Sequence, residues 1–174
     1  VGHTGSGKTT LARVIARQLE VDAGKVFING HDITHFPLEE LRAHTGYVPQ
    51  EAFLFSESLA ANVSLGHEDA TDEQVLAALE GAQLVKDLDQ IPDGLETMIG
   101  ERGVNLSGGQ RQRTALARVL LLSPRLLILD DTLSAVDTHT ADAILEHLRP
   151  FAAERTTILV THRLSTVCHA EQII

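Results

Sequence analysis

Aromatic residues and cysteine are scarce in this sequence of 174 residues. It contains no tryptophan, one tyrosine, five phenylalanines and a single cysteine, Cys168. Because one cysteine cannot form a disulfide within the chain, the sequence excludes a disulfide-stabilised scaffold and suits a reducing compartment. The sequence also lacks a signal-peptide pattern and any run of 18 apolar residues, so it predicts no membrane-spanning helix.

Positive charge is scarce as well. Fourteen Lys and Arg residues stand against 24 Asp and Glu residues, which gives a formal net charge of −10. An acidic chain does not attract a nucleic-acid backbone, which counts against binding of DNA or RNA. With 43% hydrophobic and 22% charged residues, the composition is typical of a globular domain, and the length suffices for one domain with a core.

The most informative segment lies at the start of the chain. Residues 2–9 read Gly-His-Thr-Gly-Ser-Gly-Lys-Thr, which fits the phosphate-loop pattern G-x-x-x-x-G-K-[ST]. Its glycines allow backbone angles at which successive N–H groups point inward around an anion. Residues 10–19 have the apolar spacing of a helix, whose N-terminus attracts phosphate. A glycine-rich turn before a helix is the alternative, but a turn would not require the Lys-Thr pair.

The side chains of this loop have expected roles. Lys8 is expected to reach the β- and γ-phosphates of a nucleotide, and the Thr9 hydroxyl is expected to bind Mg²⁺. The predicted phosphate-binding residues are Gly2, Thr4, Gly5, Ser6, Gly7, Lys8, Thr9 and Thr10.

A second segment, residues 106–110, predicts another anion site. Ser107 and Gln110 have the spacing of a capping box, which predicts a helix that runs to about Leu122. Two glycines leave the start of this helix without side chains, so a phosphate is expected to meet Ser107, Gly108, Gly109 and Gln110. Two such helix ends, far apart in one chain, are explained if each nucleotide lies between two chains.

Three apolar segments predict buried strands, at residues 46–50, 126–131 and 156–161. Ligands bind at the edge of the sheet where parallel strands end. At this edge Asp130 is expected to hold Mg²⁺ through water. Gln50 is expected to reach Mg²⁺ or the attacking water, with a surface amide as the alternative. His162 is expected to donate a hydrogen bond to the γ-phosphate or to that water.

The pattern between the first two strands is helical. Residues 71–74 have the spacing of a capping box before an apolar helix, and residues 84–91 predict a second helix. We therefore expect a helical insert in a parallel-sheet fold. A further helix is predicted at residues 138–149.

Together these segments resemble the nucleotide-binding domain of ABC ATPases. The matching motifs are Walker A (2–9), the Q-loop (Gln50), the signature motif (106–110), Walker B (126–130), the D-loop (134–137) and the switch histidine (His162). The resemblance covers almost the whole chain. It implies an α/β fold of the P-loop NTPase (RecA-like) type, with a mostly parallel sheet flanked by helices and an inserted α-helical subdomain. The implied division is a RecA-like ATP-binding core at residues 1–57 and 123–174 and a helical subdomain at 58–122, with the fold truncated at both ends.

The resemblance implies that the chain binds ATP and Mg²⁺ and hydrolyses ATP. Two such domains would close head to tail, with Ser107 and Gly109 of one chain touching the γ-phosphate held by Lys8 of the other. ATP binding would close the pair, and hydrolysis would reopen it.

Two segments resemble the exporter type of ABC transporter, residues 100–103 as its X-loop and residues 53–62 as the segment after its Q-loop. In that family these segments receive the membrane domain. The resemblance therefore implies a transmembrane domain upstream in the same polypeptide and a location at the cytoplasmic face of the plasma or inner membrane. Residues 52–55 are expected either to pack in the core or to form an exposed pocket for a partner. The alternatives to an exporter are a soluble ABC ATPase of DNA repair or translation and a regulatory nucleotide-binding subunit.

Asp131 departs from the family pattern, which has a catalytic glutamate after Walker B. Its carboxylate is one methylene shorter and would fall short of the attacking water by on the order of 1 Å, which can lower the rate ~10²-fold. An aspartate here resembles the degenerate site of heterodimeric transporters. We therefore expect Asp131, His162 and Gln50 to be the catalytic residues of a heterodimer with unequal sites. A homodimer in which Asp131 works adequately is the alternative.

Overall fold

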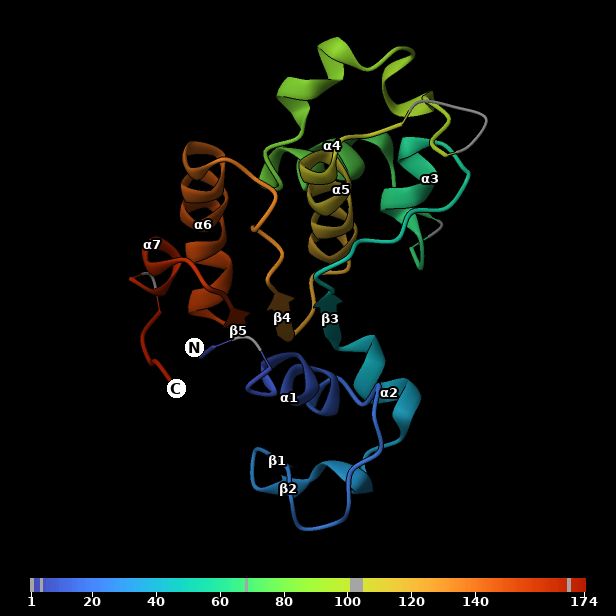
Figure 1. The fold of residues 1–174 in the computed structure, drawn as a ribbon. Coiled ribbons are helices and arrows are strands. Elements are labelled where there is room, and N and C mark those ends of the chain that lie inside the picture. The colour runs from blue at the N-terminus through green and yellow to red at the C-terminus, as the bar shows by residue number, and fades with distance from the viewer. Residues whose placement is uncertain (1, 4, 68, 101–104, 169) are drawn as a thin grey trace.

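The computed structural model of the chain describes residues 2–3, 5–67, 69–100, 105–168 and 170–174. Its helices (η for 3₁₀ helices) and strands are, in chain order, α1 (Lys8–Ile15), β1 (Phe27–Ile28), β2 (His31–Asp32), η1 (Ile33–His35), α2 (Leu38–Ala43), β3 (Thr45–Val48), α3 (Leu59–Ser64), α4 (Asp72–Gly81), η2 (Val85–Gln90), η3 (Gly94–Glu96), α5 (Gly108–Leu121), β4 (Leu126–Asp130), α6 (Thr138–Ala153), β5 (Thr156–Val160) and α7 (Leu164–Val167). Helices lie on both faces of a central parallel sheet, which confirms the predicted α/β class (Figure 1).

The central sheet has the strand order β3-β4-β5, and both pairs of strands are parallel. In their register, Val48 lies opposite Leu129, and Asp130 lies opposite Val160. The three strands therefore end at one edge of the sheet. The predicted strand at residues 126–131 is confirmed except for its last residue, Asp131, which follows the strand.

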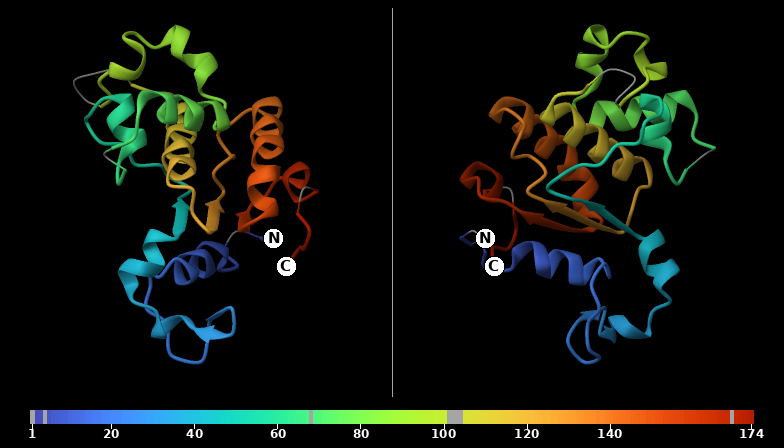
Figure 2. Two further views of the ribbon diagram at one scale, coloured as in Figure 1. Left: turned by 180° about the vertical axis from the view of Figure 1, so that it is seen from behind. Right: turned by 45° about the vertical axis from the view of Figure 1, so that its right-hand side comes forward.

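The central strand β4 faces two separate cores. Leu127 and Leu129 are buried in the larger core, to which α5 and α6 contribute, whereas Ile128 packs with Ala12 of α1 and with Ala16, the residue that follows α1. Figure 2 shows α1 on one side of the sheet and α5 and α6 on the other. A strand covered on both faces has apolar residues at every position, which explains why this segment does not alternate between apolar and polar.

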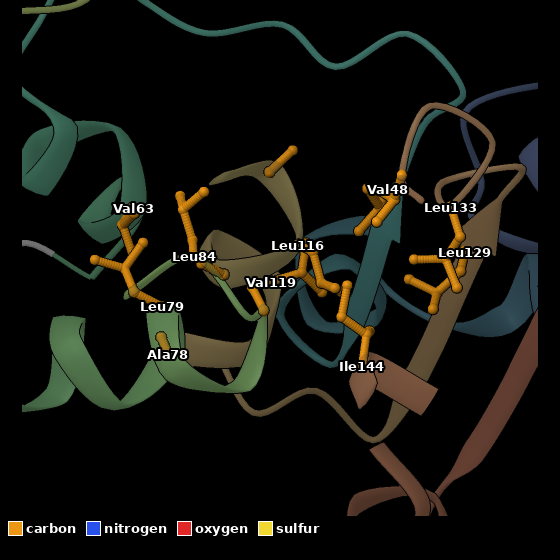
Figure 3. Close-up of a cluster of buried hydrophobic side chains, with 14 of the residues drawn as sticks. Val48, Val63, Ala78, Leu79, Leu84, Leu116, Val119, Leu129, Leu133 and Ile144 are labelled. Carbon is orange, nitrogen blue, oxygen red and sulfur yellow. The ribbon is translucent and has the colours of Figure 1, made fainter. Parts of the chain in front are cut away.

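The helical insert packs on the larger core. Figure 3 shows Leu116 and Val119 of α5 between Leu79 and Leu84 on one side and Val48 of β3 on the other. All five side chains are buried. Helix α5 therefore packs against both the rest of the insert and the sheet. A shift of α5 would change the packing on both sides.

The local signals at helix starts are confirmed. At α4, the hydroxyl of Thr71 accepts the N–H of Gln74, and the Gln74 side chain accepts the N–H of Thr71, as the capping box predicts. The predicted helix at residues 84–91 is present as the tighter 3₁₀ helix η2. Asn29 and Gly30 join β1 to β2, and both residues have the positive φ that a two-residue hairpin turn requires.

Helix ends are less well predicted. Helix α1 ends at Ile15 rather than Leu19, because Arg17 has a left-handed φ of 52°. Helix α6 does not end at Arg149 but continues through Pro150 to Ala153. No helix among the described residues, α6 included, has the length and apolarity needed to cross a membrane.

The two phenylalanines of residues 52–55 lie at the surface. Phe53 is 66% exposed and Phe55 43% exposed, and their rings pack edge to face with centroids 5.0 Å apart. Ala52 and Leu54 pack against the larger core. The core interpretation of this segment is therefore right for its aliphatic residues and wrong for its aromatic ones.

Candidate nucleotide-binding site

The segment at residues 2–9 has the open backbone that its glycines predict. Gly5 and Gly7 have φ angles of 83° and 91°, in the left-handed region where a side chain would be strained. Helix α1 begins directly after the loop, and its N-cap residue, Gly7, gives no side-chain hydrogen bond to the first turn. The N–H groups of this first turn are therefore available to an anion. Thr4, also predicted to bind phosphate, lies outside the described residues.

Lys8 is directed into this loop. Its Nζ donates to the carbonyl oxygens of Gly2 at 2.7 Å and His3 at 2.8 Å, and to Oγ of Ser6 at 3.3 Å. The carbonyl oxygens hold the ammonium charge inside the loop, next to the amide groups that would surround a phosphate. The loop thus combines a fixed cation with free N–H donors, which is the chemistry that a polyphosphate requires.

A buried carboxylate ties the end of β4 to this loop. Asp130 is 1% exposed; its Oδ1 accepts a hydrogen bond from Oγ1 of Thr9, and its Oδ2 accepts one from the hydroxyl of Tyr47, both at 3.0 Å. Burial and the charge of Asp130 raise the pKa of Tyr47, so that the phenol remains a hydrogen-bond donor. Side chains from α1, β3 and β4 therefore meet at a single carboxylate.

The oxygens of Thr9 and Asp130 fit a magnesium ion. Mg²⁺ prefers oxygen ligands and commonly takes only one or two from the protein, with water and phosphate supplying the others. The hydroxyl and the carboxylate lie 3.0 Å apart beside the phosphate loop. Within the described residues, no group of three or more His, Cys, Asp or Glu side chains could hold a metal ion. The Thr9–Asp130 pair is therefore the strongest candidate there.

Asp131 follows the carboxylate, and hydrogen bonds hold its backbone on both sides. Its N–H donates to the carbonyl oxygen of Val160 at 2.8 Å, and its own carbonyl oxygen accepts from the N–H of Ser134 at 3.1 Å and from its hydroxyl at 2.7 Å. Its φ of 50° lies in the left-handed region, which Asp adopts more readily than Glu. These three hydrogen bonds constrain the backbone at Asp131 and so oppose a shift that would compensate for a short side chain.

Gln50 and His162 lie at the same edge of the sheet. Strand β3 ends at Val48 and strand β5 ends at Val160, in each case two residues earlier. Both side chains are exposed. The carbonyl oxygen of Gln50 accepts a hydrogen bond from Nε2 of Gln112 at 3.0 Å, so its backbone is anchored while its side chain is free to reach a ligand.

The capping box predicted at the start of α5 is present. Oγ of Ser107 accepts the N–H of Gln110 at 3.2 Å, and Oε1 of Gln110 accepts the N–H of Ser107 at 2.9 Å. Nε2 of Gln110 also donates to Asp87 at 3.1 Å, so this side chain supports the helix start. The two glycines between them are half-buried. A Cβ at Gly109 would lie 2.9 Å from the carbonyl oxygen of Ala135.

The two predicted phosphate-binding segments lie at the starts of helices on different faces of the sheet. Helix α1 covers one face of the sheet, whereas α5 packs on the other (Figure 2). No hydrogen bond joins residues 107–110 to residues 2–9 in the part of the chain that the structure describes. One phosphate group therefore does not contact both segments of the same chain unless they move.

Sequence reasoning missed the side chains that hold the site together. Tyr47 could have been found, because it lies one residue before the end of β3 on the face that α1 covers, close to Asp130 at the end of β4. Gln112 and Arg163 gave no signal. Arg163 donates to two carbonyl oxygens of the turn at residues 134–136, at 2.9 and 2.7 Å, and only the folded chain brings these groups together.

Comparison with known proteins gives a consistent family. A family model described as "ABC transporter" matches residues 1–134. The chain is 48% identical over 173 residues to the "Probable multidrug resistance ABC transporter ATP-binding/permease protein YheI" of Bacillus subtilis. It is 45% identical over 174 residues to the "ATP-dependent lipid A-core flippase" of Chromobacterium violaceum. These matches cover 99% and 100% of this chain but 30% of each relative.

A solved structure gives the same result for the fold. The structure described as "Structure of a bacterial Atm1-family ABC exporter with ATP bound" matches with a TM-score of 0.88 and 41% sequence identity. The match covers 95% of this chain and 29% of that chain. This likeness confirms the predicted P-loop NTPase fold.

Proposed function

Because the chain belongs to the ABC transporter family, we propose that it is the nucleotide-binding domain of an ABC exporter and that it binds and hydrolyses ATP. ATP is the substrate in this proposal, and hydrolysis powers export across a membrane. The observation that carries the proposal is the hydrogen bond between Thr9 and Asp130, which joins the phosphate loop to the end of the central strand. The proposed division is a RecA-like core at residues 1–57 and 123–174 with a helical subdomain at 58–122.

The roles proposed for the site residues follow from their placement. Lys8 and the amide groups of residues 2–9 bind the phosphates. Thr9, Asp130 and Gln50 hold Mg²⁺, which when bound supplies positive charge against the phosphate oxygens. Tyr47 holds one oxygen of Asp130 and so orients the other toward Thr9.

The proposed hydrolytic groups lie at the strand ends. Gln50 and Asp131 orient and polarise the attacking water, and His162 donates a hydrogen bond to the γ-phosphate or to that water. The base in this proposal is the carboxylate of Asp131. Because three hydrogen bonds hold the backbone of Asp131 and its side chain is short, this carboxylate would not reach the attacking water. We therefore propose that this chain hydrolyses ATP weakly at its own site.

We infer that a second nucleotide-binding domain completes each site. The start of α5 and the start of α1 lie on different faces of the sheet, which favours contact of Ser107, Gly108 and Gly109 with a nucleotide held by another chain. Gln110 supports this helix start through its bonds to Ser107 and Asp87. The intact start of α5 can serve a partner that carries glutamate in place of Asp131, which favours a heterodimer.

A transmembrane domain, upstream in the same polypeptide, is the other proposed partner. The chain spans 30% of the length of its relatives, one of which is named as an ATP-binding/permease protein. The exposed pair Phe53 and Phe55 offers an apolar contact for that domain. The proposed location is the cytoplasmic face of the plasma or inner membrane.

The ATPase rate of the full-length protein tests these proposals. Wild type alone is compared with Asp131→Glu and with Asp89→Glu, which adds the same methylene at an exposed site. We expect weak turnover by wild type and by Asp89→Glu, and a rise of ~10²-fold in Asp131→Glu. A wild-type rate above ~1 s⁻¹ that Asp131→Glu does not increase would show that Asp131 is an adequate base, which favours the homodimer. Failure of all three proteins to bind ATP would contradict the proposed function itself.

A further inference from the structure

A buried glutamine joins three segments of the candidate site. Gln112 lies on α5 and is 6% exposed. Its Nε2 donates to the carbonyl oxygen of Gln50 at 3.0 Å and to Oγ of Ser134 at 3.5 Å, and its Oε1 accepts the N–H of Ala135 at 3.2 Å. One side chain therefore connects the segment after β3, the turn after β4 and helix α5.

The turn at residues 134–136 lies between β4 and α6, and groups other than Gln112 also contact it. Arg163 holds two of its carbonyl oxygens from another side, at 2.9 and 2.7 Å. Gly109 lies close enough that a Cβ would be 2.9 Å from a carbonyl oxygen of the turn. Arg163 does not reach α5 by a hydrogen bond among the described residues, and Gly109 has no side chain. Gln112 is thus the side chain that ties this turn both to α5 and to Gln50.

We propose that Gln112 is a positioning residue, which fixes the backbone at Gln50 relative to the turn that follows Asp131. The inference rests on the proposed function, because Gln50 and Asp131 are the groups that would orient the attacking water. Among the described residues, the hydrogen bonds of Gln112 go to the segments that follow β3 and β4 and not to the phosphate loop. Its loss is therefore expected to lower turnover while ATP affinity stays the same.

The substitution Gln112→Met tests this in the full-length protein. Methionine keeps the length of the side chain and removes both donors and the acceptor. Gln90→Met is the matched control, because Gln90 is exposed at the end of η2. We expect kcat to fall roughly 10- to 100-fold in Gln112→Met, with affinity for the slowly hydrolysed analogue ATPγS within about twofold of wild type. The control is expected to match wild type in both quantities.

Two outcomes of the kinetic comparison would overturn the proposal. One is a kcat for Gln112→Met within twofold of the Gln90→Met value. The other is a loss of ATPγS affinity as large as the loss in kcat, which would mean that the whole site is disturbed. If Gln112→Met does not fold, Gln112→Glu replaces it, because a carboxylate keeps the shape and the acceptor for Ala135 but removes both donors. The same two outcomes then decide.

Amide hydrogen exchange provides a readout that does not depend on activity. Peptides that contain Gln50 or residues 134–136 are expected to exchange faster in Gln112→Met than in wild type, while peptides of the β1–β2 hairpin stay unchanged. Unchanged exchange at both segments would contradict the proposal even if kcat falls. If wild type proves unable to bind ATP, the proposed function fails, and the exchange comparison still decides whether Gln112 couples the two segments.

Discussion

The N-termini of α1 and α5 are both proposed to meet phosphate, but they are built in opposite ways. Helix α5 begins with Ser107 and Gln110, each of which accepts the N–H of the other. Helix α1 begins with Gly7, which gives no side-chain hydrogen bond, and the charge nearby is the Lys8 ammonium held by carbonyl oxygens. At the start of α5 the capping side chains accept backbone N–H groups, whereas at the start of α1 no side chain accepts them.

This difference indicates what stabilises the start of each helix. The hydroxyl of Ser107 accepts from Gln110 and keeps its own hydrogen for a further acceptor, so this end is formed before a ligand arrives. The loop before α1 has free N–H groups and glycines in place of caps, so a bound phosphate would supply the missing partners. We therefore expect ATP to stabilise the start of α1 more than the start of α5.

The largest effect is expected from Lys8→Ala, which removes the ammonium group held beside the start of α1 while the start of α5 stays intact. Loss of a charge-assisted bond to phosphate is expected to weaken ATP binding roughly 10- to 100-fold. Equilibrium binding of a fluorescent ATP analogue to the full-length protein measures this, with Lys25→Ala as a control at an exposed lysine. Equal affinities of the two variants would mean that the loop is not the main phosphate site.

The second prediction separates capping from phosphate binding at Ser107. Ser107→Asp keeps a good cap, but its carboxylate would repel a phosphate, so we expect turnover to fall more than roughly tenfold with unchanged stability. Ser107→Ala loses the cap and is expected to cost about 1 kcal/mol of stability as well. ATPase rates and thermal unfolding measure the two effects. Full activity of Ser107→Asp would contradict contact of this end with phosphate.

A smaller effect is expected from Gln110→Ala. It removes the acceptor for the N–H of Ser107 and the bond to Asp87, so the start of α5 is less well held and turnover is expected to fall a few-fold. Gln74→Ala breaks the equivalent capping box at α4, away from the site. Both variants are expected to lose about 1 kcal/mol of stability, but only Gln110→Ala is expected to lose turnover. A similar loss of turnover in both would indicate a general effect.

The smallest effect concerns the third cap beside the site, Asp137 at the start of α6, which differs from a serine cap because it titrates. The backbone and side-chain hydrogen bonds of Thr140 lower the pKa of Asp137 from its ordinary value of 3.8. Its contribution to stability is therefore complete above that value and is lost as the pH falls through the lowered pKa. Asp137→Asn keeps a cap at every pH.

Protease resistance after heating at pH 7 and at pH 3 measures this contribution. Wild type and Asp137→Asn are expected to agree at pH 7, and wild type is expected to lose more resistance than the variant at pH 3. The same loss in both proteins would mean that other carboxylates account for the acid sensitivity.

The sequence predicted those parts of the molecule that depend on neighbouring residues. The capping boxes of α4 and α5, the buried strand β4 and the positive φ angles of Gly5 and Gly7 all follow from patterns a few residues long. The ends of helices were harder to predict, because local backbone preferences compete there with tertiary packing. Helix α6 continues through Pro150, which lacks an N–H, and its inner face carries the buried residues Ile144 and Leu148.

The contacts that assemble the site could not be predicted in this way. The bond of Tyr47 to Asp130 requires the register of β3 on β4, and the bonds of Gln112 require the rotation of α5 about its axis. The close approach of Gly109 to the turn at residues 134–136 depends on the same packing. The residue types expected at the site were therefore readable from the sequence, whereas the side chains that support them became visible only in the fold.

The pairing of β3 with β4 has a consequence for how the protein is made. These neighbouring strands are about 80 residues apart in the chain, with the helical insert between them. A ribosome that adds 5–20 residues per second would need roughly 4 to 16 s to complete the partner of β3 after β3 itself has been synthesised. During this time β4, which pairs with β3 among the described strands, is not yet available, and the insert that is synthesised next can cover Val48. The helical insert can thus protect the nascent chain before it takes part in any reaction with nucleotide.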